Sequence, residues 1–270
     1  LNDRKITAIL WATSAIVLIG NSDILSVTLP EYLRLVTFAG EAMPAKQLKV
    51  WMNKLPDTKF VNLYGPTEIT VDCTFYEVDR EFADDEFIPI GKDCKNKQIL
   101  VFNEEDKLVK VGECGELCVR STGVALGYYN NRAKTEEVFV QNPLHNLYSD
   151  KIYRTGDIVK YNERGEIEFV SRKDFQIKHK GNRIEMGEIE VAVNSIPEVT
   201  NAACIFDQPN DKIVLYYTTT DGQELDVINL VKEKIPVYMF PEVIIPLKVM
   251  PYNMNGKIDR IELKKMYETR

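Results

Sequence analysis

Histidine and tryptophan are scarce in this chain, which holds two of each among 270 residues. Both histidines, His145 and His179, lie far in sequence from the Cys114 and Cys118 pair, so a zinc site at that pair lacks its remaining ligands. Basic charge is also in deficit, with 34 lysines and arginines against 41 acidic residues and a net charge of -7. This balance argues against nucleic acid or an anionic membrane as a partner.

Long apolar runs and a regular cysteine framework are missing too. The most apolar segment, residues 6–20 (ITAILWATSAIVLIG), is too short to span a bilayer, and no small-residue cleavage site follows it. We therefore interpret it as a buried strand running into a helix, and we expect no membrane insertion. The five cysteines are an odd number scattered through the chain, which favours reduced thiols and a cytoplasmic protein.

Two common phosphate-binding motifs are absent as well. The chain has no G-x-x-x-x-G-K-[ST] sequence and no G-x-G-x-x-G after a strand. These absences argue against P-loop nucleotide hydrolysis and against dinucleotide binding. The informative features that remain are polar clusters at turns.

The apolar pattern changes twice along the chain, and each part predicts its own architecture. β-rich runs at residues 6–12, 33–39 and 59–64 alternate with helical patterns, an order typical of a parallel sheet covered by helices. From about residue 89 to residue 172, short strands separated by turns predict a small antiparallel barrel-like part. The segment after residue 172 predicts a compact α+β unit. The expected fold class is therefore α/β combined with α+β.

The predicted strands of the second part can be stated individually. We expect strands at residues 98–102, 107–111, 116–120, 151–154, 157–161 and 167–170, with one helix at residues 132–139.

Three polar clusters carry candidate chemistry, and each also has an ordinary explanation. In residues 62–68 (NLYGPTE), Tyr64 offers a stacking face and Glu68 a carboxylate for Mg²⁺, although a plain turn would have the same composition. Asp157, in a Thr-Gly-Asp turn, can accept two hydrogen bonds from a ribose diol, but Asp is also a common turn residue. Lys257 follows a glycine in a loop, where it is either merely exposed or able to meet a carboxylate or phosphate.

The joint order of the motifs distinguishes these readings. Gly40-Glu41, NLYGPTE, GELCVRSTGVALGYYN, YRTGD, SRKDFQIKHKGNRIEMGEIE and NGKIDR occur in succession from residue 40 to residue 260. The sequence resembles the adenylate-forming, AMP-binding superfamily over nearly its whole length. The resemblance is closest to the D-alanine:carrier-protein ligases and to the amino-acid adenylation domains of non-ribosomal peptide synthetases.

The resemblance implies an ATP-dependent, AMP-forming ligase that activates a small amino acid, with D-alanine favoured, and transfers it to the phosphopantetheine thiol of a carrier protein. ATP or AMP and Mg²⁺ are the implied ligands. Nucleotide contacts are implied for Asn62, Leu63, Tyr64, Gly65, Pro66, Thr67, Asp157, Arg172 and Lys257. Catalytic roles are implied for Lys257, Thr67 and Glu68, of which Glu68 would hold the metal ion, and substrate contacts for Ala39, Gly40, Val71 and Lys257.

The resemblance also implies a division of the chain. Residues 1–173 would be the C-terminal part of the large AMP-binding domain, and residues 174–270 a small mobile domain that turns about a hinge at Asp174. The family's phosphate loop, and the aspartate that receives the substrate ammonium, precede the position of Leu1. We therefore expect little adenylation by these 270 residues alone.

Two other functions stay open on the sequence. An acyl- or aryl-CoA synthetase of the same superfamily would use the same motifs with a substrate that lacks an amine. A non-catalytic nucleotide-binding or carrier-docking module is the third possibility, but it would be free to lose Glu68, Asp157 and Lys257, and all three positions are filled.

Overall fold

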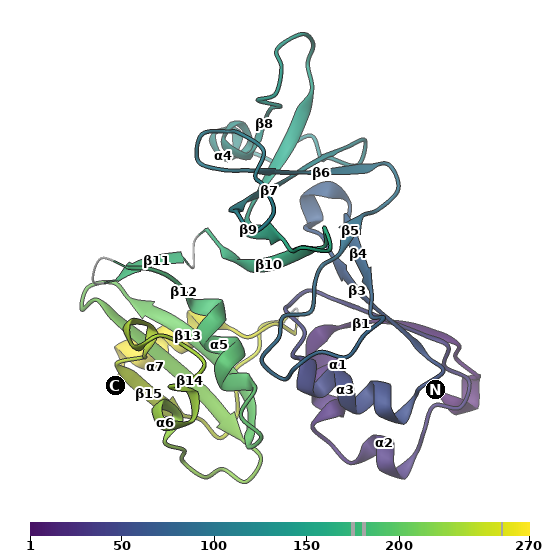
Figure 1. Cartoon of the computed structure of the whole chain (residues 1–270), viewed down its shortest axis with the longest axis vertical. Helices are drawn as coiled ribbons and strands as arrows, with labels where there is room; N and C mark the ends of the chain where they lie inside the picture. Colours follow the sequence, from purple (N-terminus) through teal and green to yellow (C-terminus); the bar gives the residue numbers. More distant parts are fainter. Residues whose placement is uncertain (174–175, 180–181, 255) are drawn as a thin grey trace.

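The computed structural model describes residues 1–173, 176–179, 182–254 and 256–270. Figure 1 shows three parts of the fold: a sheet with its helices next to the N-terminus, a second sheet above it, and a C-terminal α+β unit beside them. This mixed α/β arrangement with a half-barrel confirms the predicted fold class.

The N-terminal sheet has the predicted parallel core. Strands β1 (Ala8–Ala12), β2 (Leu35–Ala39) and β3 (Lys59–Tyr64) pair in parallel, and β4 (Thr74–Glu77) and β5 (Lys92–Asp93) extend the sheet in antiparallel fashion. The helices of this part are η1 (Asn2–Arg4), α1 (Thr13–Gly20), α2 (Ile24–Val27), α3 (Ala45–Lys54) and η2 (Thr67–Ile69). The Trp51 indole is buried between α1 and α3 and donates a hydrogen bond to the carbonyl of Ile16 at 2.9 Å. Residues 6–20 therefore form a strand and a helix, but the prediction of a buried strand was wrong. Because β1 lies at the edge of the described sheet, only its Ile9 is buried and Leu10 is 60% exposed.

The half-barrel follows from the short-strand region. Its order is β10-β9-β7-β6, with β8 paired to β9. Its elements are β6 (Lys97–Phe102), β7 (Cys114–Ser121), α4 (Arg132–Val138), β8 (Phe139–Gln141), β9 (Lys151–Tyr161) and β10 (Ile167–Arg172).

Two strand predictions in this region were wrong. The strands expected at residues 151–154 and 157–161 are one continuous strand, because Gly156 passes through the turn-like region at a φ of 73° without ending the pairing. The strand expected at residues 107–111 is reduced to an isolated bridge between Phe102 and Leu108. Positive φ angles at Asp106 and Gly112 bend the chain on either side of it, which leaves too short a run for a strand.

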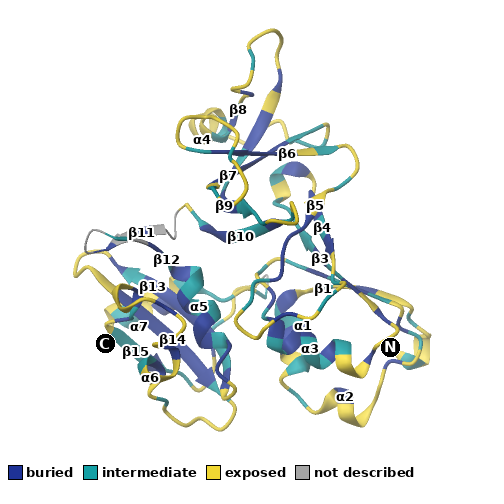
Figure 2. Cartoon of the chain, viewed as in Figure 1, coloured by how far each residue is buried: buried dark blue, intermediate teal, exposed yellow. Residues whose placement is uncertain are grey.

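The C-terminal unit is a three-stranded sheet with helices on both faces. Strands β13 (Val199–Asp207), β14 (Lys212–Thr219) and β15 (Val243–Pro246) form the sheet, and β11 (Gln176–His179) pairs with β12 (Asn182–Glu185) in a hairpin. One face packs on α5 (Met186–Asn194) and α6 (Val227–Val231), and the other on α7 (Arg260–Glu268). A short turn, η3 (Val237–Met239), precedes β15. Figure 2 shows β13 and β14 in dark blue, the colour of buried residues.

Several side chains join the C-terminal unit to the N-terminal part of the chain. The Lys46 ammonium on α3 donates to the carbonyls of Ile196 at 3.1 Å and Val199 at 3.3 Å, just after α5 ends. Lys234 lies 3.4 Å from the carboxylate of Asp85. The division at residue 173 stays a prediction, and the expected hinge residue Asp174 lies outside the described residues.

Two further findings concern the chain as a whole. Among the described residues, no helix has both the length and the apolar character needed to cross a membrane. All five cysteines are free thiols.

Candidate active site

A cavity of about 490 Å³ lies where the carboxyl ends of β2 and β3 meet the half-barrel and the C-terminal unit. Ligands in open α/β sheets bind beyond these strand ends. The predicted site residues that line the cavity are Gly40, Asn62, Leu63, Tyr64, Gly65, Pro66, Asp157, Arg172 and Lys257. Ala39, Thr67, Glu68 and Val71 are not among the lining residues.

The loop after β2 is fixed by a hydroxyl from the first residue of α1. Thr13 donates from Oγ1 toward the carbonyls of Ala39 at 3.3 Å and Glu41 at 3.1 Å. Gly40 between them has a φ of 105°, which side chains other than hydrogen rarely allow. The backbone at the end of β2 therefore approaches the cavity without a side chain in the way.

The loop after β3 turns back sharply at Gly65. A Cβ atom placed on Gly65 would lie 2.1 Å from the Val71 carbonyl oxygen, so no other residue fits without moving the backbone. The carbonyl of Tyr64 accepts a hydrogen bond from the Cys73 amide at 2.7 Å, which closes the turn. Asn62 lies two residues before Tyr64 on β3. It is buried and donates from Nδ2 to the carbonyl of Pro89 at 2.9 Å.

Asp157 joins the sheet to the half-barrel at the cavity wall. Its Oδ2 accepts a hydrogen bond from the Tyr64 phenol, and its Oδ1 accepts one from Arg172 Nη1 at 2.9 Å. The side chain is 8% exposed. Burial raises the pKa of Asp157, while the Tyr64 hydrogen bond and the charges of Arg172 and Lys257 oppose the rise. Burial, followed by the neighbouring Asp157 charge, raises the pKa of Tyr64 well above its usual range.

Glu68 lies beside the cavity rather than in its wall. Its Oε1 accepts a hydrogen bond from the Tyr128 phenol at 2.5 Å, and its carbonyl accepts one from the Ala125 amide at 2.8 Å. Thr67, immediately before it, begins η2. Within the described part of the chain, no group of three or more His, Cys, Asp or Glu residues is arranged to hold a metal ion.

Val71 lies on the outer side of the same loop. It is 58% exposed, and it follows Thr70 with both residues at positive φ, 61° and 66°. Left-handed backbone is unfavourable for β-branched residues, so this pair is a strained segment.

Lys257 reaches the cavity from the C-terminal unit. Its Cε lies 3.6 Å from where a Cβ of Gly40 would be, so the side chain passes directly over the end of β2. The loop that carries it is closed by two bonds with Asn253: the Asn253 amide donates to the Lys257 carbonyl at 2.8 Å, and the Lys257 amide donates to Asn253 Oδ1 at 3.1 Å. The positive charge of Lys257 acts to lower the pKa of both Asp157 and Glu41.

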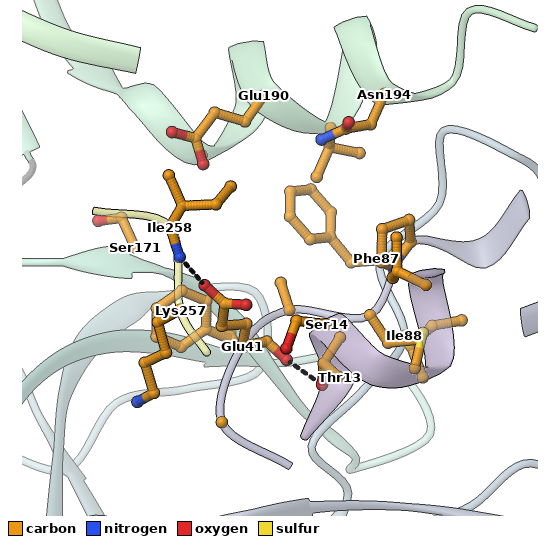
Figure 3. Close-up of a pocket in the computed structure, with 18 of the residues that line it drawn as sticks. Thr13, Ser14, Glu41, Phe87, Ile88, Ser171, Glu190, Asn194, Lys257 and Ile258 are labelled. Atoms are coloured by element: carbon orange, nitrogen blue, oxygen red, sulfur yellow. Dashed lines mark hydrogen bonds between the residues drawn. The ribbon is translucent and has the colours of Figure 1, made fainter. Parts of the chain in front are cut away.

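Three further charged residues of the quoted motifs, Glu41, Glu190 and Arg260, line this cavity, although no role was predicted for them. Arg260 donates to both carboxylate oxygens of Glu190 at 2.8 Å, and Glu41 accepts a hydrogen bond from the Ile258 amide at 3.1 Å. Figure 3 shows the Glu41 carboxylate aimed at the backbone nitrogen of Ile258. The position of Glu41 directly after a predicted strand could have indicated that it belongs to the site. No local sequence feature indicates this for Glu190.

Comparisons with known proteins agree with this geometry. Residues 1–129 match the family of AMP-binding enzymes. The chain is 36% identical over 232 residues to tyrocidine synthase 1 of Brevibacillus parabrevis, which covers 84% of this chain and 21% of the relative. It is 36% identical over 236 residues to a dimodular nonribosomal peptide synthase of Bacillus subtilis strain 168, covering 84% of this chain and 10% of the relative.

A solved structure shares the fold. Klebsiella oxytoca NpsA in complex with 3-hydroxyanthranilyl-AMSN superposes with a TM-score of 0.86 at 25% identity, over 98% of this chain and 54% of that one. The fold and site thus define a domain of the adenylate-forming type. The chain belongs to the AMP-binding superfamily, and its homologues include adenylation domains of peptide synthetases. It spans about half of the solved neighbour and about a fifth or less of these two relatives.

Proposed function

We propose that this chain is part of an ATP-dependent, AMP-forming ligase that activates a small amino acid, with D-alanine favoured, and passes it to the phosphopantetheine thiol of a carrier protein. One observation carries the proposal. Asp157, Tyr64 and Lys257, which come from three distant motifs, line a single cavity at the carboxyl ends of parallel strands. The similarity to peptide synthetases supports an amino acid as the substrate.

The nucleoside would lie against the half-barrel side of this cavity. Asp157 is held by Tyr64 and Arg172, so its carboxylate is oriented before any ligand arrives. A buried carboxylate of this kind can accept hydrogen bonds from both hydroxyls of a ribose. The Gly65 turn would place backbone and the faces of Tyr64 and Pro66 near the base and the α-phosphate.

In the first step, a carboxylate oxygen of the amino acid attacks the α-phosphorus of ATP. A new oxygen–phosphorus bond forms, the bond to the bridging oxygen breaks, and pyrophosphate leaves with that electron pair. Two anions must approach each other, so the main need is neutralisation and alignment. Lys257, directly over Gly40, is the residue we assign to bridge the substrate carboxylate and the phosphate, with Thr67 adding a hydroxyl at the loop.

Glu68 is the residue we assign to Mg²⁺. Magnesium is commonly bound through one or two carboxylates together with substrate phosphates and water, so a single glutamate suits it without a protein cage. Tyr128 donates a hydrogen bond to Oε1, and the Glu68 carboxylate would hold the ion. When bound, Mg²⁺ would offset the negative charge of the phosphates.

We propose that residues 174–270 turn about Asp174 between the two steps and withdraw Lys257. In the second step, the carrier sulfur attacks the acyl carbon and the thiol proton passes to solvent, while the carbon–oxygen bond breaks and AMP leaves with that electron pair. The preference for a small side chain rests on Gly40 at the end of β2, because of the predicted wall residues Ala39, Gly40 and Val71 only Gly40 lines the cavity. Lys257 serves both the nucleotide and the acid in this scheme.

The nucleotide part can be tested on the 270-residue chain by isothermal titration with AMP and adenosine. We expect AMP to bind and the Lys257→Ala variant to bind adenosine unchanged. The reaction is tested by pyrophosphate exchange across amino acids, D-alanine included, on the longest reading frame that contains these residues. Failure of every amino acid to promote exchange, while aryl or fatty acids do, would move the function to the CoA ligases.

A further inference from the structure

The carboxylate of Glu41 crosses from the N-terminal sheet to the C-terminal unit. Its Oε1 accepts the Ile258 amide at 3.1 Å, a contact between residues 217 positions apart. Ile258 is the residue directly after Lys257, so the bond acts on the backbone that carries the lysine. In Figure 3, Glu41 and Ile258 face each other, while the Lys257 side chain extends away to the other side.

Both ends of this contact are held by their own elements. On the sheet side, Thr13 Oγ1 donates to the Glu41 carbonyl at 3.1 Å and fixes the backbone. On the other side, two hydrogen bonds join Asn253 to Lys257. Fixing the Ile258 amide therefore also fixes where the Lys257 side chain begins.

The groups around Glu41 act on its carboxyl in opposite directions, and burial has the largest effect. Burial raises the pKa of the Glu41 carboxyl, whereas the Ile258 amide and the charges of Arg260 and Lys257 lower it, and Glu190 raises it. Arg260 is itself held by Glu190 through both carboxylate oxygens at 2.8 Å. The C-terminal unit thus presents an amide donor and two cations, one of which is paired with Glu190, to a half-buried carboxylate.

We propose that Glu41 is a positioning residue that docks the backbone at Ile258 and thereby holds Lys257 over Gly40. The inference rests on the proposed adenylation function for its consequence, but the docking itself does not depend on any nucleotide. Loss of Glu41 would release the loop while leaving the ribose site formed by Asp157, Tyr64 and Arg172 in place.

Hydrogen exchange of the ligand-free chain tests the docking directly. We expect the Ile258 amide to exchange roughly tenfold faster in Glu41→Ala than in the parent, as for the loss of one hydrogen bond to a carboxylate. Glu41→Gln, which keeps an oxygen acceptor of the same length, should restore most of the protection. Glu77→Gln, an exposed glutamate paired with Lys59 on the same sheet, is the matched control and should leave Ile258 unchanged.

A second variant covers the case in which Glu41→Ala does not fold. Glu41→Asp keeps the charge but is one methylene shorter, so it should also speed exchange at Ile258, with circular dichroism unchanged. Unaltered Ile258 exchange in a folded Glu41→Ala or Glu41→Asp protein would overturn the docking role.

The consequence for Lys257 is read from ligand affinity. Glu41→Ala should weaken binding of an aminoacyl sulfamoyladenosine roughly tenfold, while adenosine binding stays within about twofold, because only the former reaches the lysine. Equal weakening of both ligands would overturn the positioning role. Absence of binding in the parent would instead count against the proposed function, since the exchange result stands without it.

Discussion

The Tyr64 phenol donates a hydrogen bond to the Asp157 carboxylate, although 93 residues separate them. The contact ties the end of β3 to the middle of β9, and Arg172 on β10 holds the other carboxylate oxygen at 2.9 Å. Three strands from two sheets therefore orient one buried acid. A carboxylate fixed in this way loses little freedom on meeting a diol, which favours tight recognition of a ribose.

The first prediction concerns ribose recognition by Asp157. Asp157→Asn replaces one acceptor oxygen by a donor, and we expect AMP affinity to fall about tenfold to a hundredfold, the usual range for hydrogen bonds to a charged group. Affinity for 2′,3′-dideoxy-AMP should be the same in the parent and the variant. Isothermal titration with both nucleotides measures the difference.

The control for this prediction is Asp106→Asn. Asp106 pairs with Arg154 on the same half-barrel, with its side chain 50% exposed. That variant should bind AMP as the parent does. If Asp157→Asn weakened the dideoxy nucleotide as much as AMP, the acid would be acting on the fold and not on the ribose.

The second prediction concerns the turn at Gly65. Gly65→Ala would place a methyl group 2.1 Å from the Val71 carbonyl oxygen, so the backbone of residues 65–73 must shift. We expect a loss of about 3 kcal/mol of unfolding free energy, together with loss of AMP binding. Thermal melts and titration measure the two effects.

Gly165 offers a matched comparison. It has a φ of 73°, and a Cβ placed there would meet nothing within 4 Å. Gly165→Ala should therefore cost only about 1 kcal/mol, from the left-handed backbone, with AMP binding retained. Equal losses at the two positions would show that conformation, and not close approach, makes glycine necessary at Gly65.

The strands show which parts of the fold could be predicted from the sequence. Period-two apolar runs predicted strand β3 at residues 59–64 with its observed bounds, because a buried central strand leaves a clear pattern. The expected strand at residues 107–111 failed because its run is short and its bounding turns bend it away from its neighbour. β12 was not predicted at all, since four residues carry too little alternation to distinguish a strand from a loop.

The candidate site also contains residues that the sequence predicted and residues that it did not. The order of the motifs predicted Tyr64, Asp157 and Lys257 as site residues, and in the structure all three line one cavity. The contact of Glu41 with Ile258 joins a loop on one unit to the backbone of another, and no local pattern encodes how two units dock. Residues whose role depends on such docking could not be predicted from spacing.

The third prediction concerns the pH dependence of stability at Asp150. Burial alone would raise its pKa, but hydrogen bonds from Arg120, Asn142 and His145 outweigh burial and lower the pKa to about 2. A folded pKa below the ordinary value of 3.8 means that the stabilisation is complete above pH 4 and is lost as the pH falls toward 2. Asp150→Asn should therefore cost on the order of 1 kcal/mol at pH 7, after allowance for solvent screening, and almost nothing near pH 2.

Urea unfolding at pH 7, 4 and 3 measures this dependence. Asp57→Asn, at an exposed position on the loop before β3, should change the unfolding free energy by less than about 0.5 kcal/mol at every pH. A cost at Asp150 that stayed constant down to pH 3 or grew with acid would contradict the assigned direction of the pKa shift.

The last prediction concerns the strained segment beside the candidate site. Val71 has a φ of 66° and an exposed side chain, so its backbone conformation is unfavourable and little packing compensates for it. Asparagine tolerates left-handed backbone far better than a β-branched residue. Val71→Asn should therefore raise the unfolding free energy by about 1 kcal/mol, measured by urea denaturation at pH 7.

Val249→Asn, at an exposed valine without positive φ, should change it by less than about 0.5 kcal/mol. A loss of stability in Val71→Asn would mean that the valine side chain stabilises this loop and that its strain is offset there. If the variant is more stable but binds an aminoacyl sulfamoyladenosine less tightly than the parent does, the strain at Val71 serves substrate binding.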